Sequence, residues 1–434
     1  MADLDLDALP AWLSTRRWFG GKGRPIASVR VADEARLRHL RVLTLEVAYR
    51  SGPSPERYLV PLREGMDVPL EEALDEESCR IVFGILRERR EVRTREGVLR
   101  GERFDAQGSA LDALPERPGV RRLSAEQSNT SLVFGDAVIL KLIRKLVPGR
   151  NPELEVGALL ARRGFRSTPA LLAALTLSND VEATIGVAHR FVQVDCDGWS
   201  YVLEALARDG GASVALLEEV RELGARVGEM HVALADPDDP AFAPEPVARD
   251  DLQRWSRTLL SELEETVKVA SSAVPGLAAK APELRSRIAR LAEAKPSGVR
   301  LRQHGDLHLG QVLRSQGEWL IFDFEGEPAR PVSERRQKHA PWKDVAGMLR
   351  SFAYAAAAAE KRGAPAIPRE PLRRAFLDGY RSRASPLLPG DPATAQALLD
   401  SLELEKLLYE LRYEVGHRPD WVGIPARDLL QEAP

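Results

Sequence analysis

The chain has 434 residues, of which 44% are hydrophobic and 29% charged, a balance typical of a folded globular protein and not of a disordered or membrane-spanning one. With 62 basic against 65 acidic residues the net charge is -3, so no overall field attracts nucleic acid or anionic lipid, and an anionic ligand needs a local site. The length exceeds that of a usual single domain and predicts two or three packed units.

The cysteine content and the start of the chain exclude further classes of protein. Cys79 and Cys196 are the only cysteines, too few for a disulfide framework or a site built from several thiolates. Residues 1–5 are acidic and lack the apolar core of a signal peptide, and no stretch reaches the roughly 18 apolar residues of a membrane span. We therefore expect a cytoplasmic protein with no nucleic-acid or membrane partner.

The first region, to about residue 105, is predicted to be a small sheet-rich unit with one short helix. Leu43, Leu45, Val47 and Tyr49 alternate at period two, the pattern of a strand with one buried face. The Arg-rich end of this region, residues 87–103, alternates arginines with apolar residues and lacks interleaved aromatic residues. Charged edge strands explain this end better than a nucleic-acid surface does.

A β-hairpin is predicted over residues 130–143, where two apolar runs flank a Gly135-Asp136 turn. A helix should follow Asn151-Pro152, because Asn is a good N-cap and Pro is favoured at the first helical position. After about residue 200 the pattern becomes mostly helical. Helix-type periodicity covers residues 214–235, 251–272, 281–294, 342–361, 369–383 and 393–416.

Phosphoryl transfer requires three elements: a group to orient the acceptor hydroxyl, oxygen ligands for magnesium, and a cation or amides for the nucleotide phosphates. Residues 304–323 contain candidates for the first two. Asp306 lies in a glycine-containing loop, Gln311 follows five residues later, and a predicted strand over residues 320–322 leads to Asp323. A hairpin of that length can return Asp323 to the neighbourhood of Asp306 and Gln311.

This arrangement resembles the catalytic loop of protein kinases, and its His-Gly-Asp-x-His-x-x-Gln form points to the aminoglycoside-phosphotransferase branch. The resemblance implies that Asp306 is the catalytic base and that Gln311 and Asp323 bind magnesium. Glu325 stands where a protein kinase has the glycine of Asp-Phe-Gly, and a metal ligand and a cap of the loop are equally good interpretations of it.

His304 and His308 are four residues apart, as in a zinc-binding helix. The intervening Gly305-Asp306 neither keeps a helix nor supplies the glutamate of such a site, so roles in holding the loop are favoured over zinc binding. We also count both histidines among the candidate substrate-binding residues.

The candidate nucleotide-binding residues surround the predicted hairpin. The usual glycine-rich loop is missing, but a run of small polar residues would let backbone amides approach phosphate; it comprises Gln127, Ser128, Asn129, Thr130 and Ser131. In the kinase order the second strand carries the lysine that contacts the nucleotide phosphates, which selects Lys141. Its partner on the next helix is Glu155 or Glu153. Phe191 and Gln193 lie where the family order places the hinge that stacks on adenine.

Flanking segments extend the resemblance to the maltokinase family over nearly the whole chain, at residues 16–24, 149–156, 323–331 and 344–352. A C-terminal segment resembles the one with which maltokinases hold the disaccharide; it contains Lys406, Glu410, Tyr413, Glu414, Arg418 and Trp421. Helical spacing puts three or four of these on one face, and sugars are bound by charged groups beside an aromatic platform, here Trp421. Without the resemblance, an exposed helix with ordinary ion pairs is the better interpretation.

The resemblance implies an α+β fold of the bilobal protein-kinase type. Its parts would be an N-terminal cap subdomain over residues 1–90, an intermediate N-lobe subdomain with the nucleotide-binding hairpin over 91–200, and a helical C-lobe with the catalytic loop and sugar site over 201–434. It also implies ATP and Mg2+ as cofactors. The reaction would transfer the γ-phosphoryl group to the anomeric hydroxyl of maltose, giving maltose 1-phosphate for α-glucan and glycogen synthesis.

Two questions about partners and two alternative functions stay open. A monomeric or weakly oligomeric state and an association with a trehalose-processing enzyme are compatible with the resemblance. Glucosamine and aminoglycoside kinases share the fold: Glu410 and Glu414 would suit an amino sugar, whereas Lys406 and Arg418 favour a neutral one. The other alternative is a regulatory nucleotide-binding pseudokinase; the presence together of Lys141, Asp306, Gln311 and Asp323 argues against it.

Overall fold

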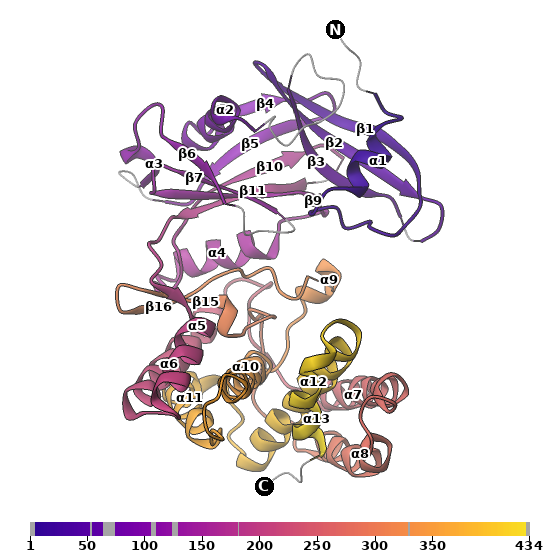
Figure 1. The fold of residues 1–434 in the computed structure, drawn as a ribbon. Helices are drawn as coiled ribbons and strands as arrows, with labels where there is room; N and C mark the ends of the chain where they lie inside the picture. The colour runs from indigo at the N-terminus through magenta and orange to yellow at the C-terminus, as the bar shows by residue number, and fades with distance from the viewer. Residues whose placement is uncertain are drawn as a thin grey trace. The chain divides into compact units, whose positions relative to one another are not determined.

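The structure is a computed structural model that describes residues 5–52, 54–63, 74–105, 110–123, 129–180, 182–328 and 330–430. The chain forms two compact units, one from residues 1–162 and 169–193 and the other from residues 163–168 and 194–434. The first unit is built mainly on sheets and the second on helices (Figure 1), which confirms the expected α+β class. The further division of the first unit near residue 90 stays a prediction. Within the described residues, no helix has the length and apolar character needed to cross a membrane.

An antiparallel four-stranded sheet begins the first unit, with the strand order β1-β2-β3-β9. The residues that alternate along β2 form its core, since Leu43, Leu45 and Val47 are fully buried. They pack with α1 and with Trp18 and Phe19, which follow it. The bounds of these elements are α1 Leu9–Ser14, β1 Ile26–Leu37, β2 Leu40–Tyr49, β3 Glu56–Arg63 and β9 Lys145–Leu146.

A seven-stranded antiparallel sheet forms the rest of the first unit, with the order β4-β5-β10-β11-β8-β7-β6. The predicted hairpin is present as β7 and β8, and the helix predicted after Asn151 is α4, which begins at Pro152. Helix α2, capped by Asp75, packs on this sheet through Phe83 and Leu86. The bounds are α2 Glu76–Arg87, β4 Glu91–Arg93, β5 Val98–Arg103, α3 Ala110–Ala113, β6 Val120–Arg122, β7 Asn129–Phe134, β8 Val138–Ile143, α4 Pro152–Arg162, β10 Leu171–Ser178 and β11 Glu182–Arg190.

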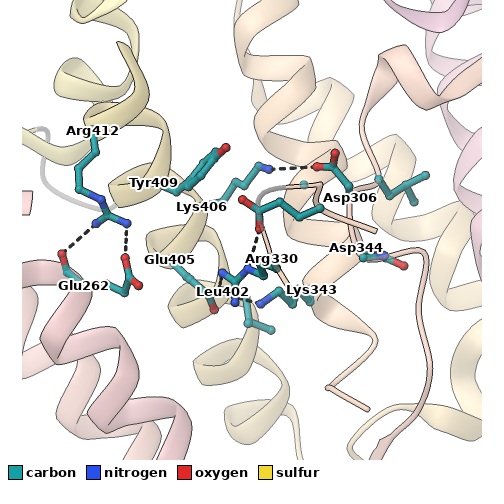
Figure 2. Close-up of a pocket in the computed structure, with 14 residues that line it drawn as sticks. Glu262, Asp306, Arg330, Lys343, Asp344, Leu402, Glu405, Lys406, Tyr409 and Arg412 are labelled. Atoms are coloured by element: carbon teal, nitrogen blue, oxygen red, sulfur yellow. Dashed lines mark hydrogen bonds and ion pairs between the residues drawn. The ribbon is translucent and has the colours of Figure 1, made fainter. Parts of the chain in front are cut away.

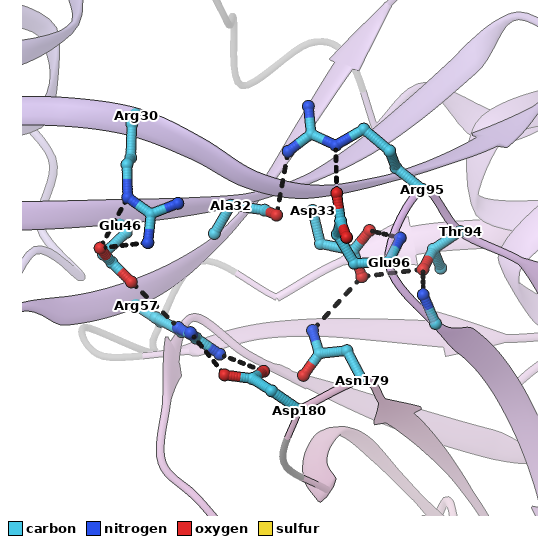
Figure 3. Close-up of polar contacts among 11 residues, drawn as sticks. Arg30, Ala32, Asp33, Glu46, Arg57, Thr94, Arg95, Glu96, Asn179 and Asp180 are labelled. Carbon is cyan, nitrogen blue, oxygen red and sulfur yellow. Dashed lines mark hydrogen bonds and ion pairs between the residues drawn. The ribbon is translucent and has the colours of Figure 1, made fainter.

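Polar side chains join the two sheets of the first unit (Figure 3). Asp33 of β1 is 1% exposed and accepts hydrogen bonds from Thr94 Oγ1 at 2.8 Å and Asn179 Nδ2 at 3.3 Å. Close by, Arg57 of β3 makes a two-pronged contact with Asp180 at 2.9 and 3.0 Å. The turn between β10 and β11 is therefore fastened to the four-stranded sheet by a buried carboxylate and a partly exposed ion pair.

The second unit consists mainly of helices around a small three-stranded sheet of order β12-β15-β16. Its helices are α5 Gly198–Asp209, α6 Val214–Leu234, α7 Arg249–Ala270, α8 Leu277–Glu293, α9 Val332–Arg335, α10 Trp342–Lys361, α11 Glu370–Ala384, α12 Pro392–His417 and α13 Gly423–Leu430. Its short strands are β12 Cys196–Asp197, β13 Glu245–Pro246, β14 Val299–Arg300, β15 Val312–Ser315 and β16 Glu318–Ile321, and its 3-10 turns are η2 Leu309–Gln311, η3 Ser385–Leu387 and η4 Pro419–Trp421.

Periodicity locates most of these helices well. Helix α10 spans the predicted residues 342–361, and α6, α7, α11 and α12 agree with prediction within two residues at each end. Helix α8 begins earlier than predicted, because Pro282, which is favoured at a helix start, lies inside this helix. Helix α5 was not predicted, since it begins at Gly198, a poor helix former, behind an Asp197 cap.

Candidate active site

The loop that carries Asp306 is held by Asp344, a buried residue in the first turn of α10. The Asp344 carboxylate accepts hydrogen bonds from the backbone amides of His304 and Gly305, both at 2.9 Å, and contacts His231 Nε2 at 3.0 Å. Burial alone would raise the pKa of Asp344, but the contact with His231 and the amide hydrogen bonds hold it below its ordinary value. Asp344 therefore fixes the backbone immediately before Asp306. It lies in one of the segments that carry the family resemblance, but no motif had singled it out.

Two glycines allow the loop and α10 to approach each other. Gly305 has a φ of +84°, a conformation that costs glycine little and other residues more. Gly347 lies one turn after Asp344 on α10, and a Cβ there would come within 2.4 Å of the Leu307 carbonyl oxygen. The backbone on either side of Asp306 is thus packed directly against the helix.

Asp306 itself is mostly buried, with a side chain that is 21% exposed, and its Oδ1 lies 3.7 Å from Lys406 Nζ of α12 (Figure 2). Burial raises the pKa of Asp306 above its ordinary value, and Glu327 and Asp323 add to the rise, while Lys406 and His304 oppose it. A buried carboxylate with a raised pKa beside a cation is the environment expected of a group that accepts a proton.

Gln311 and Asp323 come together as the sequence led us to expect. Gln311 ends η2, Asp323 follows β16, and Gln311 Nε2 lies 3.3 Å from Asp323 Oδ2. Asp323 has a φ of +66°, a left-handed conformation that Asp tolerates better than most residues. Glu325 lies in the next turn, where its backbone carbonyl accepts a hydrogen bond from Arg335 Nη1 at 3.0 Å. The metal-binding roles of these side chains stay predictions.

The two histidines of the loop have different surroundings. His304 is 1% exposed, its Nε2 contacts the Phe322 carbonyl oxygen at 2.9 Å, and its ring packs on Phe324. This placement suits a role in holding the loop and argues against direct sugar binding. His308 accepts a hydrogen bond from the Gly310 amide at 3.0 Å and lines the pocket beside Asp306. Burial, with the nearby Lys406 and His304, lowers the pKa of His308 to about 4, so its ring is neutral at physiological pH.

An outer pocket of about 470 Å³ opens beside Asp306. All six residues of the C-terminal segment singled out from the sequence line it, together with Asp306 and His308. The complete lining is Trp199, Asp306, His308, Gly310, Gly347, Ser351, Tyr354, Lys406, Tyr409, Glu410, Tyr413, Glu414, Arg418 and Trp421. Among these, Trp199 of α5 and Tyr354 of α10 were not predicted, because an isolated aromatic residue in a helix carries no sequence signal that distinguishes a pocket from a core.

Both glutamates of the outer pocket are engaged by basic or hydroxyl groups of the protein. Glu410 accepts a hydrogen bond from Arg350 Nε at 3.0 Å, and Glu414 accepts from Tyr354 at 3.2 Å and from Arg418 Nε at 2.9 Å. Burial raises the pKa of Glu410 although Arg350 opposes this. These carboxylates therefore form part of the wall, with their charges largely compensated.

Trp421 lines the outer pocket but does not present a wholly open face. Its ring is nearly parallel to that of Tyr354, with centroids 6.3 Å apart, and Lys361 Nζ lies 4.4 Å from the Trp421 centroid. Arg418 also lies 5.5 Å from this ring. The predicted aromatic platform is thus a cluster of Trp421, Tyr354 and cations.

A smaller pocket of about 50 Å³, the inner pocket, also has Asp306 in its lining (Figure 2). It shares Asp306, Gly347, Lys406 and Tyr409 with the outer pocket. Its remaining lining is mostly charged and comprises Glu262, Gly305, Leu307, Glu327, Arg330, Lys343, Asp344, Leu402, Glu405 and Arg412. Asp306, Lys406 and Tyr409 therefore stand between the two pockets.

In the first unit, Lys141 of β8 forms an ion pair with Glu153, the side chains meeting at 3.1 Å. Glu153 is 5% exposed, and its backbone amide donates to Asn151 Oδ1 at 2.8 Å at the start of α4. The open choice between the two glutamates thus goes to Glu153. Glu155 lies two residues further along the helix and is partly buried, and its role among the candidate nucleotide-binding residues stays a prediction.

The run of small polar residues before β8 is only partly described, because Gln127 and Ser128 lie outside the described residues. Asn129 begins β7. Thr130 is buried and accepts a hydrogen bond from Arg144 Nε at 2.9 Å, and Ser131 is also buried within the strand. The placement of Thr130 and Ser131 argues against direct contact of these two side chains with a nucleotide.

The predicted hinge follows β11. The Phe191 amide donates to the Ala137 carbonyl oxygen at 2.9 Å, and the Arg121 guanidinium lies 5.0 Å from the Phe191 ring. Gln193 is exposed two residues later. The nucleotide-binding role of Phe191 and Gln193 stays a prediction.

Comparisons with known proteins agree with this organisation. Residues 119–384 match the phosphotransferase enzyme family, and residues 12–78 match the maltokinase N-terminal cap domain. A glucosamine kinase of Mycolicibacterium smegmatis is 31% identical over 322 residues, which cover 71% of this chain and 78% of that protein. A glucosamine kinase of Streptacidiphilus jiangxiensis is 29% identical over 337 residues, covering 72% and 74% of the two chains.

Solved structures extend the similarity to the whole fold. A glucosamine kinase crystal structure superposes with a TM-score of 0.74 at 25% identity, covering 99% of this chain and 98% of the other. A glucosamine kinase in complex with glucosamine, ADP and inorganic phosphate gives a TM-score of 0.71 at 24% identity, covering 99% of both chains.

Proposed function

We propose, from the premise that the chain belongs to the phosphotransferase enzyme family, that it is an ATP-dependent sugar kinase whose acceptor is maltose. The product would be maltose 1-phosphate, a precursor for α-glucan and glycogen synthesis. The observation that carries the proposal is that Asp306 and the six C-terminal residues resembling a maltose-binding segment line one pocket. Its volume of about 470 Å³ is within the range that binds drug-sized ligands and so suits a disaccharide.

In the proposed mechanism Asp306 orients the acceptor hydroxyl and takes its proton as the bond to phosphorus forms. Asp344 and Gly347 keep the loop fixed, so that the carboxylate meets the hydroxyl in one orientation. Lys141, held by Glu153, supplies the cation for the nucleotide phosphates, and Phe191 provides a surface for adenine.

Gln311 and Asp323 fit a magnesium site, because amide and carboxylate oxygens are the donors that this ion prefers. The Gln311 amide presents its nitrogen to Asp323 here, and turning the amide over presents its oxygen instead. Glu325, in the turn that follows, is the candidate for a further ligand. When bound, magnesium neutralises charge on the phosphoryl group being transferred.

The charge pattern of the outer pocket favours a neutral sugar. An amino sugar is a cation and needs an uncompensated carboxylate, but Glu410 is paired with Arg350 and Glu414 with Arg418. Lys406 beside Asp306 adds a further cation at the point where the acceptor arrives. These three pairs are the reason for preferring maltose.

Glucosamine is the second candidate, because the two curated relatives above bear the name glucosamine kinase. The discriminating experiment measures kcat/KM for maltose, glucosamine and an aminoglycoside with ATP and magnesium, and identifies the product by phosphorus NMR. We expect phosphorylation of maltose at the anomeric oxygen with at least about a tenfold preference over glucosamine. A preference for glucosamine would replace maltose in the proposal, and the absence of turnover with all three sugars would overturn the kinase assignment.

A further inference from the structure

Each carboxylate around the two pockets has a basic group of the second unit within ion-pair distance. Apart from Asp306, each has its own partner: Glu262 pairs with Arg412, Glu327 with Arg330, Asp344 with His231, Glu405 with Lys343, Glu410 with Arg350 and Glu414 with Arg418. Lys406 is the basic group paired with Asp306. Among the described residues, the distance of 3.7 Å between Lys406 and Asp306 is longer than that of each pair just named. The Asp306 carboxylate thus lies near one cation, at a distance longer than that of a hydrogen bond.

Lys406 is held in place by its surroundings. It projects from α12 and lines both pockets (Figure 2). Its Nζ lies 5.1 Å from the centre of the ring of Tyr409, which is almost one turn further along the same helix. A cation over an aromatic face is stabilised by the ring. The side chain is 30% exposed, so the charge is only partly screened by water. Its neighbour Glu405 is engaged by Lys343 and does not compete for it.

We propose that Lys406 is a positioning residue for Asp306, whose ammonium group keeps the buried carboxylate ionised and turned toward the outer pocket. This inference rests on the proposed kinase function, in which Asp306 takes the acceptor proton. It goes beyond that function because Lys406 then acts through Asp306, whereas the sequence had placed it among the residues that bind the sugar.

The charges around Asp306 explain why such a residue is needed. Burial favours the protonated carboxyl, and the carboxylates of Asp323 and Glu327, on the segment after β16, favour it too. His304 on the same loop and Lys406 on α12 favour the ionised form. His308 and Tyr409 complete the ring of titratable groups. Of these groups Lys406 is the one that lies within ion-pair distance of the Asp306 carboxylate, at 3.7 Å.

The test compares Lys406→Met with the unmodified chain across pH, using whichever sugar the unmodified chain phosphorylates. The methionine keeps most of the apolar stem and removes the charge. We expect kcat/KM near neutral pH to fall by about tenfold to a hundredfold and the acid limb of the profile to move to higher pH, because a larger share of Asp306 is then protonated. Lys406→Arg should bring the limb back toward its original position, and Lys268→Met, an exposed change on α7, should leave the profile unchanged.

A second measurement needs no sugar and separates this inference from the proposed function. Carbon-13 labelling of the aspartates, with Asp306→Asn to identify the signal, gives the titration of Asp306 directly. Its pKa should rise in Lys406→Met and not in Lys268→Met, even if every sugar tried proves inactive. An Asp306 titration and an acid limb that both stay where they were, whatever happens to kcat, would overturn the inference and return Lys406 to sugar binding alone.

Discussion

Two buried carboxylates, one in each unit, show how the same group serves stability in one place and chemistry in another. Asp33 accepts hydrogen bonds from Thr94, Asn179 and the Glu96 amide, and so joins the two sheets of the first unit. Within the described residues Asp306 has a single ion pair, with Lys406 at 3.7 Å, and otherwise faces two pockets. A carboxylate whose lone pairs are all engaged holds structure, whereas one with lone pairs directed into a pocket is available to accept a proton.

The sharpest test of this comparison is Asp306→Asn. The amide keeps the shape of the side chain but is a far weaker base, so we expect kcat to fall about a thousandfold or more while the protein stays folded. Initial rates with ATP and the acceptor sugar measure the loss. Binding of ATP should stay within about twofold of the unmodified chain by calorimetry, and turnover close to normal would remove Asp306 from the mechanism.

Asp344→Asn tests a carboxylate that should serve both stability and catalysis, because it is buried and holds the loop that carries Asp306. One acceptor oxygen is lost, so the amides of His304 and Gly305 and the ring of His231 can no longer all be satisfied. We expect a loss of about 1–3 kcal/mol in the free energy of unfolding, since a buried donor is left without its acceptor, and a fall of about a hundredfold in kcat from the displaced loop. Denaturant unfolding and steady-state rates measure the two effects, and an unchanged kcat would show that the loop does not depend on this anchor.

Asp33→Asn should affect stability alone. The change leaves a buried donor between the two sheets of the first unit without its acceptor, at an expected cost of about 1–3 kcal/mol in the free energy of unfolding. The value of kcat per folded molecule should stay unchanged. Asp180→Asn is the matched control between the same two sheets. The ion pair of Asp180 with Arg57 is largely exposed on the aspartate side and should contribute less than about 1 kcal/mol to the free energy of unfolding. Equal losses in the two variants would contradict the distinction between buried and exposed carboxylates.

Two partly buried histidines should make the stability of the protein depend on pH. Burial lowers the pKa of His339 from 6.5 to about 3, and that of His308 from 6.5 to about 4. Below pH 6.5 the unfolded chain therefore binds protons that the folded chain does not, so stability falls as the pH falls. Each histidine contributes a slope of up to about 1.4 kcal/mol per pH unit.

His339→Asn removes one of these contributions while offering an acceptor for the Ala340 amide, which donates to His339 Nδ1 at 2.9 Å. Between pH 6.5 and about 4.5, above the range where most carboxylates titrate, the slope of the free energy of unfolding against pH should be shallower in the variant. Urea unfolding at several pH values measures it. Parallel curves for the two proteins would show that His339 titrates alike in the folded and unfolded chain.

The sequence predicted the secondary structure best where periodicity is strong and unbroken. Helix α10 matches its predicted bounds, and the hairpin β7–β8 lies where Gly135 and Asp136 indicated a turn. Helix α5 escaped prediction because it begins at Gly198, a poor helix former, although Asp197 before it caps the helix. Local propensity is a weak guide where packing decides the outcome.

The sequence by itself determined the order of the chemistry: Lys141, then Asp306, Gln311 and Asp323, then the polar segment on α12, because spacing along one loop and one hairpin limits where those side chains can lie. Only the tertiary structure decided between Glu153 and Glu155. These residues are two positions apart on a helix that turns about 100° per residue, so they point in very different directions, and the packing of α4 selects one. The same reason accounts for Asp344, Arg350 and Lys406, which meet the loop or the sugar segment from helices distant in sequence, so their partners emerge only when the helices are packed.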